Sequence, residues 1–328
     1  MNSLELDIVA IGDAIVDVIA ACEDPFLEAQ GLKKGSMQLL SDEEVEKLYA
    51  AIPSAREISG GSAANSMAGA AALGLRTAFI GQVANDELGA IFSADMRSLG
   101  VRFDTPAIEG PPPTGVCVIL VTPDAQRTMN TSPGASYELT PAAVDPDLIQ
   151  SAAVTFLEGY LWGPEGPRKA MLEAAAIAKA AGRKVAFTLS ESLCIGDRRD
   201  GVLGMIEGGL VDILFGNEHE MRDLTGCGAL EDCIGALSLK VETLIITRGE
   251  YGAIALRCGE RVEVPAIPVD RIIDTTGAGD LFAAGFLAAR LRGRSLRNCL
   301  EAGTIAAAEI ISHYGARPEM NLKELVNL

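Results

Sequence analysis

Strands alternate with helices in the second half of the chain, and this pattern limits the possible folds more than any other feature. Apolar runs typical of buried strands cover Val154–Leu157, Lys184–Leu189 and Val211–Phe215, and a helical pattern over Pro167–Ala181 separates the first two. Parallel neighbours in a sheet need such helical connections. The order therefore predicts an α/β fold with a doubly wound, mostly parallel sheet flanked by helices. All 328 residues are expected to form one domain.

Four other apolar stretches do not fit this alternation, because helices do not connect them. They are Ala14–Ala21, Leu32–Leu40, Val116–Val121 and Arg127–Asn130, and the last two are typical of a hairpin. They predict a small, discontinuous β-sheet lid formed by about residues 14–40 and 102–132.

Composition excludes several classes of function. Hydrophobic residues make up 48% of the chain, which supports a large core, and the net charge is −18. Without a basic patch, we expect no nucleic-acid partner and no membrane-surface partner. The seven cysteines show no metal-ligand spacing. The N-terminus lacks the pattern of a signal peptide, and no apolar run approaches the roughly 20 residues of a membrane span. These features favour a cytoplasmic protein.

The stretch from Ile272 to Asp280 is the strongest candidate for chemistry. Two isoleucines predict a strand, the glycines a tight loop, and the apolar run after Asp280 a helix. Gly277 and Gly279 permit close approach to a ligand, and the N–H groups of Gly277, Ala278 and Gly279 at a helix start predict an anion site. Phosphoryl transfer needs such donors and a base, for which Asp280 is the candidate. An ordinary acidic residue after a glycine turn remains the alternative at this point.

Two earlier stretches also predict ligand contacts. Asp17 lies within an apolar strand, where a carboxylate is costly unless it is paired or binds a ligand. Gly60 and Gly61 precede a helix rich in small residues, which again favours close approach to a ligand. Asp13, next to Gly12, is either part of the same site or a turn residue.

The sequence Asp-Thr-Thr-Gly-Ala-Gly-Asp at 274–280 resembles the signature of the ribokinase-like (PfkB) carbohydrate kinase family, and four ordered motifs extend the resemblance over nearly the whole chain. It implies a phosphotransferase with an alcohol group as acceptor, in which Asp280 is the catalytic base. The residues that the resemblance assigns to the sugar are Asp13, Asp17, Gly60, Gly61 and Asn65. Those assigned to the nucleotide are Asn217, Thr247, Arg248, Gly249 and Gly252. Asn217 and Glu220 would hold Mg²⁺ through water.

Within this family, the segment Val211–Glu218 and Arg127 ahead of Asn130 resemble the adenosine kinase branch. That resemblance implies transfer of the ATP γ-phosphoryl group to the 5′-hydroxyl of adenosine, a reaction of purine salvage. ATP and Mg²⁺ would be cofactors, and the protein would be a monomer or homodimer that binds small molecules. The residues assigned to the acceptor are then Val16 or Met37 from the lid, Leu161 and Leu193, as a purine slot, together with Arg127. Family analogy also allows a monovalent cation such as K⁺ near Asp274 and the loop before Gly315.

Two alternatives remain open from the sequence. One is a sugar kinase of the same family, acting on ribose, fructose or a relative. The other is a nucleoside-binding protein without catalysis, although Asp280, Gly277, Gly279 and Glu220 are all present. A P-loop kinase is excluded because no lysine follows a glycine. A dinucleotide fold is disfavoured because Phe282 stands where its fingerprint has a third glycine.

Overall fold

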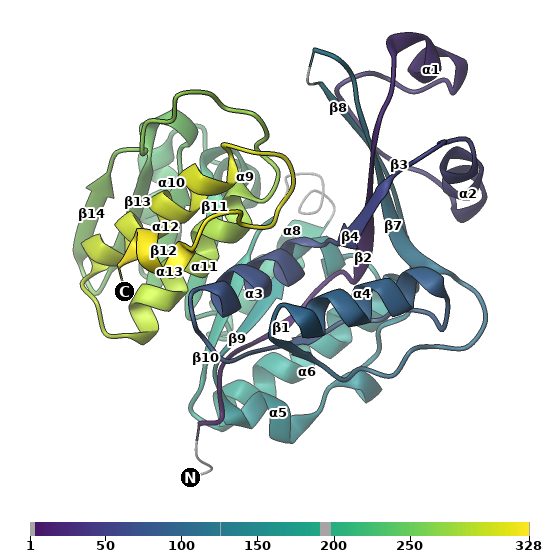
Figure 1. Cartoon of the computed structure of the whole chain (residues 1–328). Coiled ribbons are helices and arrows are strands. Elements are labelled where there is room, and N and C mark those ends of the chain that lie inside the picture. Colours follow the sequence, from purple (N-terminus) through teal and green to yellow (C-terminus); the bar gives the residue numbers. More distant parts are fainter. Residues whose placement is uncertain (1–3, 125, 191–197, 328) are drawn as a thin grey trace.

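The computed structural model describes residues 4–124, 126–190 and 198–327 and contains a large and a small β-sheet (Figure 1). In spatial order the strands of the large sheet are β14 (Glu260–Val264), β13 (Ala253–Arg257), β12 (Thr243–Thr247), β11 (Ile213–Asn217), β10 (Lys184–Thr188), β9 (Ala152–Glu158), β1 (Leu6–Ile11), β5 (Thr77–Ile80) and β6 (Val101–Phe103). The pairings from β12 to β6 are parallel, and β13 and β14 are antiparallel. The predicted doubly wound, mostly parallel sheet is confirmed.

Helices cover both faces of this sheet. One face carries α3 (Ser62–Ala72), α4 (Glu87–Ser98), α11 (Ala278–Leu291) and α12 (Leu296–Ile310). The other carries α5 (Pro146–Ser151), α6 (Glu165–Ala180), α8 (Arg199–Glu207), α9 (Glu218–Thr225) and α10 (Leu230–Leu237). Successive β1 side chains alternate between the two cores, since Ile8 and Ala10 join the first and Val9 and Ile11 the second. Burial on both faces explains why these strands are continuously apolar. The short α13 (Leu322–Val326) follows α12.

The small sheet, here called the lid, contains strands from both segments predicted for the lid, and it projects away from the large sheet (Figure 1). Its strands, in spatial order, are β3 (Met37–Leu39), β8 (Arg127–Gly134), β7 (Thr114–Val121), β2 (Ile15–Ala21) and β4 (Arg56–Ser59). The expected boundaries of 14–40 and 102–132 need correction at two places. β4 belongs to the lid because it pairs with β2, and Val101–Phe103 belongs to the large sheet because it pairs with β5.

Two expected strands are shorter or absent. Of Leu32–Leu40 only β3 is extended, because α1 (Asp24–Ala29) precedes this stretch and Gly31 and Gly35 adopt positive φ angles of 68° and 73°. Helix α2 (Asp42–Ala50) follows it. The strand expected at Ile272–Ile273 is wrong. There the chain is a loop, and Ile273 N–H donates to the carbonyl of Ile311 just after α12.

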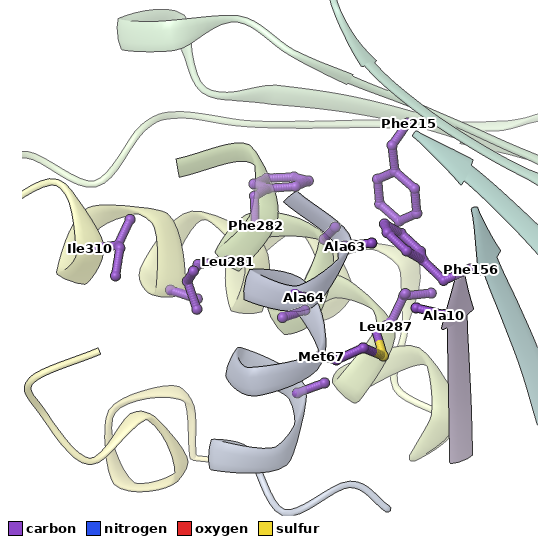
Figure 2. Close-up of a cluster of buried hydrophobic side chains, with 14 of the residues drawn as sticks. Ala10, Ala63, Ala64, Met67, Phe156, Phe215, Leu281, Phe282, Leu287 and Ile310 are labelled. Carbon is purple, nitrogen blue, oxygen red and sulfur yellow. The ribbon is translucent and has the colours of Figure 1, made fainter. Parts of the chain in front are cut away.

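Close packing of α3 against α11 sets the geometry of the site (Figure 2). A Cβ on Gly69 would lie 2.4 Å from Leu281 Cδ1, and one on Gly285 would lie 2.5 Å from the carbonyl oxygen of Ala302 in α12. Glycine at these two positions therefore permits the observed separation of the helices. Leu281 and Phe282, buried directly after Asp280, pack against Gly69 of α3 and Gly303 of α12 and so fix the start of α11 between these helices.

Candidate active site

A cavity of about 750 Å³ lies between the lid and the carboxyl ends of the large-sheet strands. Its wall combines lid strands β2, β3, β7 and β8 with the ends of β10, β11 and β12 and the first turns of α3 and α11. Open α/β sheets bind ligands at this edge. The cavity is therefore the candidate active site.

Most of the predicted site residues meet on this wall, although the sequence spreads them over more than two hundred positions. They are Asp13, Asp17, Met37, Gly61, Asn65, Asn217, Glu220, Thr247, Gly277, Ala278, Gly279 and Asp280. The polar residues predicted to bind the acceptor substrate, the anion loop and the magnesium candidates thus surround one space.

Other predicted residues lie behind the wall. A Cβ on Gly60 would be 2.4 Å from the Asp17 carboxylate, so this glycine makes room for Asp17. Gly252 has a φ of 85°, and its Cβ would be 2.0 Å from the carbonyl oxygen of Val264. Arg248 Nε donates to Glu218 at 2.7 Å, and its guanidinium lies 5.9 Å from the ring centre of Tyr251. Gly249 begins the short 3₁₀ turn Gly249–Tyr251. The predicted roles of Arg248, Gly249 and Gly252 in nucleotide binding stay predictions.

The expected purine slot needs a correction at Leu161. This side chain is fully buried in the core on the α6 side of the sheet, and Tyr160 beside it lines the cavity. Because Gly159–Trp162 form a 3₁₀ helix, adjacent side chains project in different directions. Leu193 lies outside the described residues. Val16, a second lid candidate, is buried in the core, whereas Met37 lines the cavity.

The wall contains large side chains that the sequence analysis did not assign. Leu39, Ile119 and Met129 lie on the lid side, and Tyr137 and Tyr160 also line the cavity. The period of two in the lid strands was visible in the sequence, but it does not show which face covers a ligand.

Asp280 is held by the first turn of α3. Ser62 Oγ donates to Asp280 Oδ1 at 2.6 Å, and Asn65 Nδ2 donates to Asp280 Oδ2 at 2.9 Å. Desolvation raises the pKa of Asp280 to about 6, and these two hydrogen bonds and the charge of Arg317 act in the opposite direction. A carboxylate that titrates near 6 is mostly ionised at neutral pH and is a stronger base than an ordinary aspartate.

The anion loop differs from expectation in one contact. Gly277 is the N-cap of α11 with a φ of 79°, as a glycine turn requires. The N–H of Ala278 donates to the carbonyl of Thr275 at 3.2 Å, so it does not point freely into the cavity with its neighbours. This hydrogen bond must be broken or shared before Ala278 can donate to a phosphoryl oxygen.

Glu158, at the end of β9, is a site residue that the sequence analysis missed. Its carboxylate is fully buried and accepts hydrogen bonds from the backbone N–H groups of Asp13 and Ala63. A Cβ on Gly12 would lie 2.7 Å from Glu158 Cδ. An acidic residue at the end of a buried strand, directly before a glycine, was the available signal. Glu158 joins the Gly12–Asp13 turn to the start of α3.

The half-buried Asp13, on the cavity wall, and the fully buried Glu158 form an acidic pair. Desolvation raises the pKa of Asp13 to about 7 and, together with the charge of Asp13, raises that of Glu158 well above its usual value. The folded protein therefore binds more protons than the unfolded chain once the pH exceeds the unfolded pKa values near 4.

This pair predicts that the free energy of unfolding falls as the pH rises. Between about pH 5 and pH 8 we expect Asp13 alone to contribute a loss of about 2 to 3 kcal/mol, and Asp13→Asn should remove that part of the pH dependence. Urea unfolding at each pH measures the difference between the two proteins. The control is Asp270→Asn at an exposed position, which should keep the wild-type dependence of the free energy of unfolding on pH. Identical pH dependences for wild type and Asp13→Asn would contradict the prediction.

A family model described as pfkB family carbohydrate kinase matches residues 6–322. The chain belongs to this kinase family. It is therefore a phosphotransferase with an alcohol acceptor, and kinases of this family use ATP.

Solved structures and curated relatives of this pfkB-family kinase carry different substrate names. A probable sugar kinase from Rhizobium etli CFN 42 is 41% identical with a TM-score of 0.92, and the match covers 99% of this chain and 98% of that one. Adenosine kinase from Sinorhizobium meliloti is 43% identical with a TM-score of 0.91, covering 98% and 99%. The 5-dehydro-2-deoxygluconokinase of Shouchella clausii is 29% identical over 270 residues, which are 80% of this chain and 82% of that protein.

The magnesium candidates of this pfkB-family kinase form a capping box at the start of α9. Asn217 Nδ2 donates to Glu220 Oε1 at 2.6 Å, and Asn217 N–H donates to Glu220 Oε2 at 2.9 Å. Among the described residues, no group of three or more acidic, histidine or cysteine side chains could hold a metal by itself. One carboxylate and one amide on the cavity wall fit Mg²⁺ that retains waters and binds phosphate oxygens.

The residues around Asp274 do not fit a bare monovalent cation. The guanidinium of Arg127, from β8, lies 2.6 Å from Asp274 Oδ2, with both side chains almost fully buried. Asp274 also accepts hydrogen bonds from the N–H groups of Thr276 and Gly315, at 2.9 and 2.8 Å. The predicted role of Arg127 in acceptor binding needs correction, because this residue does not line the cavity. Its positive charge already neutralises Asp274.

In the part of the chain that the structure describes, the helices are too short or too polar to span a lipid bilayer.

Proposed function

We propose that this kinase transfers the ATP γ-phosphoryl group to the 5′-hydroxyl of adenosine. The observation that carries the proposal is the division of the cavity wall into an apolar and a polar part. Met37, Leu39, Ile119 and Met129 from the lid, with Tyr137 and Tyr160, would enclose a purine. A free sugar has no group that would fill such a space. Similarity to the Sinorhizobium meliloti adenosine kinase also supports the proposal.

The polar part of the wall suits a ribose. Asp17 can accept hydrogen bonds from sugar hydroxyls, and the Asn65 amide can donate to them or accept from them. Asp13 Oδ1 is buried without a hydrogen-bond partner among the described residues. An unpartnered buried acceptor calls for a donor from a ligand. Desolvation raises the pKa of Asp17 to about 6, so a hydroxyl donor would also stabilise its ionised form.

In the proposed reaction, Asp280 accepts the proton of the attacking hydroxyl. The N–H groups at Gly277–Gly279 stabilise charge on the transferring phosphoryl group. Thr247 and Asn217, on the wall of the same cavity, would border the bound nucleotide. Asn217 and Glu220 would hold Mg²⁺ through water, and the ion would neutralise charge on the ATP phosphates. The lid side chains exclude water, which otherwise competes as acceptor.

A sugar kinase is the second candidate, because the Rhizobium etli and Shouchella clausii proteins bear sugar kinase names. In that case the same base, anion loop and Asp17 would act, and the apolar wall would contribute little.

The test is ATP-dependent ADP release with adenosine, inosine, guanosine, cytidine, ribose and fructose, with and without Mg²⁺. Burying about 150 Å² of purine at about 25 cal/mol per Å² gives roughly 4 kcal/mol, so kcat/KM for adenosine should exceed that for ribose by about 10²- to 10³-fold. A preference for a free sugar would overturn the acceptor assignment. Tight nucleoside binding without turnover of any acceptor would indicate a binding protein instead.

A further inference from the structure

Arg317 joins the segment between α12 and α13 to the end of β4 and the start of α3. It lies in the turn after α12, and its Nη2 donates to the carbonyl oxygen of Ser59 and to Ser59 Oγ, the latter at 2.7 Å. Its Nη1 donates to Asn65 Oδ1. The residue does not line the cavity, so it contacts Asp280 through Asn65 and not directly.

These contacts determine the orientation of the Asn65 amide. A guanidinium has donors and no acceptor, so the group of Asn65 that faces it must be the carbonyl oxygen. The amide nitrogen then faces Asp280 and donates to Oδ2, while Ser62 donates to Oδ1. Without Arg317, the amide could rotate by half a turn and present its oxygen to Asp280.

The orientation matters because several acidic groups surround Asp280. Asp17 on β2, Asp13 after β1 and Glu158 at the end of β9 are carboxyls of the same site. Arg127 on β8 is already paired with Asp274. Arg317 is the cation whose charge acts on Asp280 and favours the ionised carboxylate. Its charge also acts on Asp17.

We propose that Arg317 is a positioning residue for the phosphoryl transfer. It orients the Asn65 amide so that the amide N–H group, and not the carbonyl oxygen, faces Asp280. Asp280 then only accepts hydrogen bonds, as the ionised carboxylate of a general base must. The inference rests on the proposed function, because it takes Asp280 as the base. It does not depend on which hydroxyl compound is the acceptor.

The experiment compares pH profiles of kcat/KM for wild type, Arg317→Met and Arg317→Lys. The acidic limb of the wild-type profile should lie near pH 6. Loss of the charge and of the amide orientation should move it up by about one unit in Arg317→Met, and Lys should restore at least half of the shift. The matched control is Arg292→Met, because Arg292 also donates to a backbone carbonyl, that of Leu73, but lies outside the cavity. It should leave the limb in place.

Two outcomes would overturn the inference. One is a uniform loss of activity at every pH with an unmoved limb, which would leave Arg317 a purely structural residue. The other is a limb that moves equally in Arg292→Met. If Arg317→Met does not fold, Arg317→Gln must show the same upward shift, since it removes the charge and retains an amide donor.

Failure of the proposed function gives a different result. If wild type prefers a sugar to adenosine, the profiles are recorded with that sugar and still test Arg317. If no acceptor is turned over, the Asp280 carboxyl is titrated by ¹³C NMR, assigned with Asp280→Asn. A midpoint that does not rise in Arg317→Met would then contradict the inference.

Discussion

Asp280→Asn should lower kcat by about 10³-fold and change the affinity for ATP by less than about twofold, because a positioned general base contributes about 10²- to 10⁴-fold. The amide is nearly the same size as the carboxyl and can still accept the Ser62 hydrogen bond. It has no basic oxygen to take the proton of the attacking hydroxyl. The loss should therefore appear in the chemical step, as single-turnover kinetics would measure.

The matched control for this variant is Asp232→Asn. Asp232 lies in the first turn of α10, as Asp280 lies in the first turn of α11, but it is exposed and outside the cavity. It should retain nearly full activity. Near wild-type kcat in Asp280→Asn would show that another group, or water, removes the proton.

Arg127→Met should lower the free energy of unfolding by about 3 kcal/mol, because it leaves the buried carboxylate of Asp274 without its charge partner. The effect should extend to the catalytic loop. Arg127 Nη1 also donates to Thr276 Oγ1 at 3.0 Å, and its guanidinium lies 5.5 Å from the ring centre of Tyr314. Loss of these contacts would separate the lid from the loop that leads into α11. Urea unfolding measures the stability change.

The control is Arg102→Met, which breaks the pair between Arg102 and Asp104. That pair is also 2.6 Å long, but its side chains are 51% and 62% exposed, so we expect a change below about 0.5 kcal/mol.

Replacing K⁺ by choline tests the Arg127–Asp274 site independently. Wild-type turnover should change by less than about twofold if Arg127 neutralises Asp274, and a larger dependence on K⁺ would contradict that role.

Much of the site could be predicted from the sequence because its motifs are contiguous. The glycines at 277 and 279 and the carboxylate at 280 lie within one loop and one helical turn, so their local conformation follows from residue type and spacing. The same holds for Asn217 and Glu220, whose i, i+3 spacing produces the capping box. The alternation of strands and helices likewise predicted the parallel sheet.

The directions of side chains within short irregular segments could not be predicted in this way. Leu161 and Tyr160 are neighbours in a 3₁₀ helix, and only its packing against α6 decides which of them lines the cavity. The edges of the lid changed for a similar reason. β4 and β6 are both short, and whether each joins the lid or the large sheet depends on which strand edge lies beside it.

By itself, then, the sequence determined the fold class and which residues are the candidates for the anion loop and the base, because each follows from residues that are close together along the chain. Only the tertiary structure decided what surrounds that base. Arg317 contacts Asn65 across 252 positions of sequence, and Glu158 contacts Ala63 across 95. Neither contact has a spacing pattern, because the packing of α3 against α11 and the sheet brings these residues together.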